Sequence, residues 1–204
     1  MIRTRIICLA TGALLTLAAA AVSPAAPAAN QQSLALAYRA IEVTGGVYQL
    51  VSQRAFAAAI HAGATQAALA RLAAVRKALA AHRAEFDALN AKLAADMARE
   101  DSLAELTVMV RFLESPGGRS VERKTQAVFA GAPTAKMPPP DLTPAEWAAV
   151  DAFESSPEAK ALRARVQAHP TDDIPFAAPL LRIVDREADL ANCRDTQACA
   201  TGAH

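Results

Sequence analysis

Apolar side chains recur at intervals of three and four through most of the chain after residue 33, the spacing that lines one face of a helix. The pattern is plainest in one run of apolar positions: Leu103, Leu106, Met109, Val110 and Leu113. No stretch shows the sustained alternation of apolar and polar residues that is typical of a half-buried strand. The sequence therefore predicts an all-α fold, a multi-helix bundle.

The residues around Ser115 predict a sharp corner between two helices. Ser102 and Glu105 have the spacing of a capping box, which starts a helix. Ser115 and Pro116 follow; serine is a preferred N-cap, and proline is favoured at the first helical position. Proline also disfavours the helical conformation in the residue before it. We expect one helix to end just before Ser115 and the next to run from Pro116 to about Ala130.

The same signals recur 41 residues later. The matched positions are Glu105 with Glu146, Phe112 with Phe153, Ser115-Pro116 with Ser156-Pro157, and Arg119 with Lys160. A solenoid usually needs three or more repeats, so two copies favour a duplicated corner inside one bundle. We place the first copy at 102–130 and the second at 142–168. The linker between them, 131–141, contains three consecutive prolines that cannot be helical.

Further helices are expected on both sides of the two corners. A polar lead-in, 29–33, precedes helices at 34–44 and 47–61, which glycines end, and a last helix spans about 179–192. Its apolar residues are Leu180, Leu181, Ile183, Val184 and Leu190. Residues 69–97 nearly follow a heptad pattern. We favour the buried face of one long or broken helix there, with a self-associating coiled coil as the alternative.

The N-terminus has the pattern of a secretory signal peptide. Arg3 and Arg5 precede an apolar run at 6–21, and a small-residue zone allows cleavage after Ala28 or after Ala21. The run is shorter than the roughly 20 residues of a spanning helix, although an uncleaved anchor is the alternative. Cys8 lacks the context of a lipoprotein site. We therefore assign 1–28 to the signal peptide and 29–192 to one helical domain in the periplasm or outside the cell.

Composition excludes some partners. Removing 1–28 removes two basic residues and no acidic one, which leaves 19 basic against 20 acidic residues. A balance this even gives no electrostatic footprint for nucleic acid or anionic lipid. No second long apolar segment follows, so we expect no stable membrane insertion after cleavage. Aromatic residues make up only 4% of the chain, which indicates closely packed helices with thin side chains.

Two cysteines remain after cleavage, Cys193 and Cys199. In an exported protein this even number predicts one disulfide, which would close a small loop in the C-terminal tail, 193–204. Two free thiols, or pairing between chains, are the alternatives. No second Cys/His pair with zinc-ligand spacing lies nearby, and the gap between the cysteines does not fit a C-x-x-C redox motif.

No catalytic, cofactor-binding or metal-binding constellation is evident in the sequence. His82 and Glu85 lie one turn apart, but a metal site needs at least a third ligand. Ser115 and Ser156 each precede proline and have no nearby histidine, so we interpret them as caps rather than nucleophiles. Gly118 and Arg119 lie just inside a helix start, where an anion can bind. We favour a packing role for the glycines there.

The motif Phe112-x-x-Ser115-Pro116-x-Gly118-Arg119, with Glu105 seven residues before the phenylalanine, resembles the signature of domain of unknown function 2059. This family comprises exported, mostly helical bacterial proteins. The resemblance covers roughly 34–130, and the second corner is similar to a degenerate echo of the first. Leu113 stands where the family usually has a second aromatic residue. The resemblance implies a periplasmic helical domain and brings no assigned activity.

Three hypotheses about function follow. The leading one is a non-enzymatic binding module that takes an envelope protein or a small apolar ligand in an apolar groove between helices. The second is an enzyme whose site is assembled from distant residues, such as His82, Glu85, Glu114 and Arg119. The third is a coiled-coil scaffold built on 69–97. The sequence does not indicate an oligomeric state.

Overall fold

The computed structural model describes residues 30–131, 140–168 and 175–196, and these residues form helices without a strand. The helices are α2 (Gln31–Thr44), α3 (Gly46–His61), α4 (Gln66–Ala81), α5 (Arg83–Ala88), α6 (Asn90–Glu100), α7 (Leu103–Glu114), α8 (Pro116–Ala130), α9 (Pro144–Ser155), α10 (Pro157–Ala168) and α11 (Ala178–Thr196), with a short 3₁₀ turn at Pro175–Ala177. The expectation of an all-α, multi-helix bundle is confirmed.

The first helix starts earlier than expected. Asn30 accepts a hydrogen bond from the Ser33 amide (2.7 Å), so α2 begins at Gln31, within the stretch expected to be a polar lead-in. At the other end, Gly45 has a left-handed backbone (φ 80°), a conformation that glycine adopts without strain. The glycine stop predicted at this position is therefore present, and α3 starts directly after it.

Residues 69–97 form a broken helix. The interruptions lie at His82, between α4 and α5, and at Leu89, between α5 and α6. The large apolar side chains on this face, Leu72, Val75, Leu79, Phe86 and Leu93, are buried inside the same chain. The seam that a coiled coil would present to another subunit is therefore already covered.

Both serine–proline corners are present at the predicted residues. Ser115 ends α7 and caps α8, and its hydroxyl accepts a hydrogen bond from the Gly118 amide (2.9 Å). Ser156 stands between α9 and α10 in the same way, with the Ala159 amide 3.2 Å from its hydroxyl. Both predicted capping boxes are formed as well, one by Ser102 and the other by Thr143.

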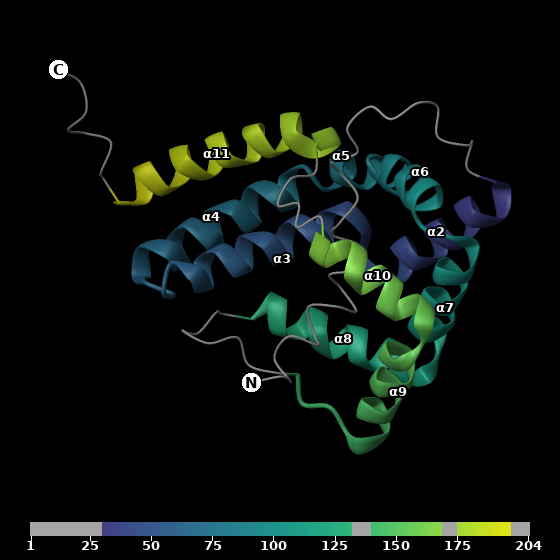
Figure 1. Ribbon diagram of the computed structural model, residues 1–204. Helices are drawn as coiled ribbons and strands as arrows, with labels where there is room; N and C mark the ends of the chain where they lie inside the picture. The colour runs from purple at the N-terminus through teal and green to yellow at the C-terminus, as the bar shows by residue number, and fades with distance from the viewer. Residues whose placement is uncertain (1–29, 132–139, 169–174, 197–204) are drawn as a thin grey trace.

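Two groups of helices make up the molecule (Figure 1). The corner helices α7 to α10 gather at one end, where α2 packs between α6 and α7. At the other end, α11 lies along α4, which lies beside α3. The main core joins the two groups, and a smaller cluster beneath α3 and α4 contains Phe56 and Phe129, whose rings meet edge to face.

The last helix differs from the expectation in length and in orientation. It runs from Ala178 to Thr196, so Cys193 belongs to the helix rather than to a tail. Val184 is buried, but Ile183 and Leu190 are 46% and 52% exposed. These two residues were expected on the apolar face, and they lie on the outer face because α11 packs mainly on one neighbour, α4.

Some expectations fall outside the described residues. They are the signal peptide, 1–28, most of the linker, 131–141, and the disulfide partner Cys199. Across the residues that the structure does describe, each helix is either too short or too polar to cross a bilayer.

Candidate functional site

An apolar groove of about 670 Å³ opens between α3, α4 and α11. Fifteen residues line it; six are alanines and none is aromatic. The aliphatic walls come from all three helices and include Val51, Ala55, Ala58, Leu72, Val75 and Leu181. Small side chains leave the groove open, because alanines on α3 and α4 do not reach across to α11.

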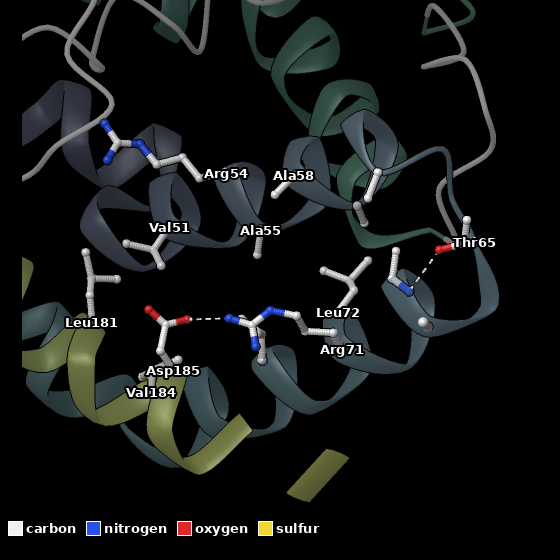
Figure 2. Close-up of a pocket in the computed structure, with 15 residues that line it drawn as sticks. Val51, Arg54, Ala55, Ala58, Thr65, Arg71, Leu72, Leu181, Val184 and Asp185 are labelled. Atoms are coloured by element: carbon white, nitrogen blue, oxygen red, sulfur yellow. Dashed lines mark hydrogen bonds and ion pairs between the residues drawn. The ribbon is translucent and has the colours of Figure 1, made fainter. Parts of the chain in front are cut away.

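One ion-pair cluster crosses the groove. Figure 2 shows Arg71 reaching from α4 towards Asp185 of α11, with Val51 and Ala55 of α3 on the facing wall. The guanidinium of Arg71 lies 3.1 Å from the Asp185 carboxylate and also pairs with Asp189 one turn further along α11. The three side chains are partly exposed, so their attraction is screened, and their main effect is to fix the register of α11 on α4.

A second polar contact also holds the middle of α11. The His82 ring lies between two carboxylates, with Nε2 3.1 Å from Glu187 of α11 and Nδ1 3.3 Å from Glu85. The hydrogen bonds to Glu187 and Glu85 raise the pKa of His82 because both favour the protonated ring. His82 and Glu85 therefore lie together as their spacing suggested, and they form part of the attachment of α11.

The two corners pack on each other with reciprocal contacts. Phe112 stacks on its own repeat equivalent, Phe153, with ring centroids 4.6 Å apart and an interplanar angle of 17°. Each capping-box glutamate is bound by a cation from the other copy. Glu105 accepts a hydrogen bond from Arg165 (2.5 Å), and Glu146 accepts one from Lys124 (2.6 Å).

These two cations are themselves repeat equivalents, because Lys124 and Arg165 are also 41 residues apart. The contacts between the two corners are therefore reciprocal, like those between two copies related by a two-fold axis. Sequence analysis matched the glutamates and phenylalanines but missed the cations. The signal that would have found them is the same 41-residue offset, applied to every charged position of the second helix in each corner.

The first of these clusters includes a carboxyl group that sequence analysis missed. Asp101, 9% exposed, accepts a hydrogen bond from Arg165, and its other oxygen has no partner among the described residues. Burial raises the pKa of Asp101 to about 7, more than the opposing effect of Arg165 lowers it. For Glu105, burial also raises the pKa, but Arg165 and the Ser102 amide outweigh it, so the pKa is lowered.

The glycines of the first corner serve packing. A Cβ atom on Gly118 would lie 1.8 Å from the Phe112 carbonyl oxygen, and one on Gly117 would lie 2.8 Å from the Ala149 side chain. The Gly118 amide is already bonded to Ser115. This agrees with the packing role favoured from the sequence. Arg119 is exposed on α8, beyond this turn.

Of the residues named for a rival catalytic site, His82 and Glu85 contact each other, but Glu114 has a different partner. Glu114 pairs with Arg39 of α2 (2.7 Å), whereas His82 pairs with Glu187 of α11. Neither of them, nor Glu85 or Arg119, lines the groove between α3, α4 and α11. Within 30–131, 140–168 and 175–196, no three histidine, cysteine or acidic side chains are grouped closely enough to hold a metal ion.

Comparison with known proteins gives no relative from which a role can be transferred. No protein-family model matches the chain, and neither the curated proteins nor the solved structures gave a match. The resemblance to domain of unknown function 2059 therefore stays a prediction.

Proposed function

We propose that this protein is a non-catalytic binding module that holds a small aliphatic molecule in the groove between α3, α4 and α11. The observation that supports this proposal is the groove itself, a volume of about 670 Å³ with walls of alanine, valine and leucine. That volume falls within the range typical of small-molecule sites.

The lining favours an aliphatic ligand over a protein segment. Interfaces for helices and peptides are anchored by large side chains, often aromatic, and the groove presents neither an aromatic wall nor an aromatic anchor. The aliphatic lining of alanine, valine and leucine side chains instead suits an alkyl chain. The Arg71–Asp185 pair also lines this groove (Figure 2). A polar group of the ligand can bind to these charged side chains.

A displacement assay tests this proposal. The purified protein is titrated with the fluorescent apolar probe N-phenyl-1-naphthylamine, and the bound probe is then displaced with 1-decanol. Ala58 lines the groove from an exposed position, so Ala58→Phe fills part of it without disturbing the core. We expect this variant to bind the probe roughly fivefold or more weakly, since added bulk competes for the same volume.

The matched control is Ala70→Phe, on an exposed position of α4 outside the groove. It changes helix propensity and surface hydrophobicity in the same way and should leave probe binding unchanged. The proposal fails if decanol displaces no probe, or if the two variants bind it equally well. Capture of a protein partner that Ala58→Phe does not weaken would also overturn it.

We further propose that the module acts in the periplasm. This rests on the basic and apolar pattern of 1–28 and on the family resemblance. N-terminal sequencing of the protein recovered from a periplasmic extract should begin at Ala29, or at Val22 for the alternative cleavage site. Recovery of a chain that retains Arg3 and Arg5 would contradict cleavage.

A further inference from the structure

A second groove, of about 510 Å³, lies between α3, α4 and α8, and its lining differs sharply from that of the first. Polar side chains from all three helices converge on it: Tyr48, Gln49, Ser52, Arg76, Arg123 and Gln126. Two arginines line this groove, and no aspartate or glutamate does. It is thus locally cationic in a chain whose overall charge is close to neutral.

Arg76 lies at the inner side of this groove. Its guanidinium donates to the Phe129 carbonyl and to the Gly131 carbonyl (2.9 Å), and it lies 5.9 Å from the Phe56 ring centroid. Burial lowers the pKa of Arg76 because its charge is partly removed from water. No carboxylate among the described residues pairs with it, so its charge is balanced only by dipoles and a ring.

Two further cations lie in or beside the groove. Arg123 is exposed on α8, and no hydrogen bond or ion pair joins it to another described residue. Arg83, which does not itself line the groove, stacks on the Tyr48 ring, 4.2 Å from its centroid, and pairs with Asp87.

One acid beside the groove is Glu122, which accepts a hydrogen bond from the lining residue Gln126 (2.9 Å) and is only 3% exposed. Burial raises the pKa of Glu122 to about 7, so near neutral pH much of this carboxyl is uncharged. It therefore cancels only part of the positive potential in the groove.

We propose that the groove between α3, α4 and α8 binds a small hydroxylated molecule that carries an oxyanion. Arg123 and Arg76 bind the oxyanion, because guanidinium groups form strong, charge-assisted hydrogen bonds with carboxylates and phosphates. Ser52, Gln49 and Gln126 supply neutral donors and acceptors for hydroxyl groups. This site is separate from the apolar groove and does not depend on the function proposed for it.

Isothermal titration calorimetry of the purified protein at low salt tests this site with three probes. Glucose 6-phosphate and glucuronate carry a phosphate and a carboxylate, and glucose carries neither. We expect heat from the anions and none from glucose. The anion that binds with the higher affinity shows whether the groove prefers a phosphate or a carboxylate.

Arg123→Gln is the informative variant, because the side chain is exposed and its removal leaves the core intact. It should weaken anion binding roughly tenfold or more, the effect of losing a charge-assisted contact. The matched control is Arg119→Gln, one turn earlier on the same helix and outside the groove. It removes the same charge and should change the affinity less than about twofold.

Two results would overturn the proposal. One is the absence of binding by either anion up to about 10 mM, which corresponds to an affinity too weak for a specific site. The other is an equal loss of binding in Arg123→Gln and Arg119→Gln, which would mean that the anions respond only to the net charge of α8.

Discussion

The two serine–proline corners begin with the same kind of capping box and turn at the same dipeptide, yet they are buried to different depths. In α7 of the first corner, Leu106, Met109, Val110 and Leu113 are all buried. In α9 of the second, only Glu146 and Val150 are buried. The first helix of the first corner therefore contributes more residues to the core than the first helix of the second does.

The comparison separates what local sequence determines from what packing determines. Caps and prolines act within one turn of helix, so equal signals produce equal turns. Depth of burial depends on the residues between the caps, which differ between the copies. One such difference is the third residue after the turn serine, which is Gly118 in the first corner and Ala159 in the second. Both residues are buried, but the space beside Gly118 does not accommodate a Cβ atom.

The largest expected effect comes from making the first corner resemble the second at this residue. Gly118→Ala places a Cβ 1.8 Å from the Phe112 carbonyl oxygen, a backbone atom that cannot move without shifting α7. We expect a loss of at least about 3 kcal/mol in the free energy of unfolding, at the upper end of overpacking effects. Urea denaturation followed by circular dichroism measures it.

The reverse exchange, Ala159→Gly, is the matched control. It removes one methyl group and raises the entropy of the unfolded chain. We therefore expect it to lower the free energy of unfolding by only about 1 kcal/mol. If the two substitutions destabilise the protein equally, the first corner is no tighter than the second and the comparison breaks down.

A second test uses Arg165 and Lys124, the two cations that each bind the capping-box glutamate of the other corner. Arg165 holds two buried acids, Asp101 and Glu105, whereas Lys124 holds Glu146, which keeps its bonds to Ser120 and to the Thr143 amide. Arg165→Met leaves two carboxylates without their cation. We expect it to lower the free energy of unfolding by about 2 kcal/mol, after allowance for the partial exposure of the arginine.

Lys124→Met should cost less than about 1 kcal/mol, because the remaining bonds of Glu146 are unaffected. Denaturant unfolding at pH 8, above the pKa of about 7 that Asp101 has beside Arg165, compares the two variants directly. Equal losses would show that the two ion-pair clusters contribute equally to stability, although Arg165 holds two acids and Lys124 holds one.

Sequence reasoning predicted the corners because their signals are local, and both turns are present at the predicted residues. It failed for Ile183 and Leu190 because apolar spacing does not say which face of a helix finds a neighbour. The residues that line the two grooves could not be predicted, since each groove is formed by side chains from three helices distant in sequence. The two ion pairs between the corners could have been predicted, because Lys124 and Arg165 are separated by the same 41-residue offset.

The smallest effect is expected where one copy has an ion pair and the other lacks it. Arg163 of the second corner pairs with Glu154 (2.8 Å), and the equivalent positions in the first corner hold Glu122 and Leu113. Glu122 is thus a buried acid without a cation, and one of its oxygens has no partner among the described residues. Its pKa is raised from 4.5 to about 7 by burial.

The sign of the pH dependence follows from this shift. Between pH 4.5 and 7 the folded chain keeps a proton on Glu122 that the unfolded chain has lost, so this residue makes stability fall as pH rises through that window. Glu122→Gln removes that dependence. We expect the variant to be about 1 kcal/mol more stable than the parent at pH 8 and no more stable at pH 4.5. Thermal unfolding across this range gives both values, and comparison with the parent at each pH cancels the similar titration of Asp101. A variant that is less stable than the parent at pH 8 would mean that the ionised carboxylate has a partner that stabilises it, and the difference between the two corners at this position would disappear.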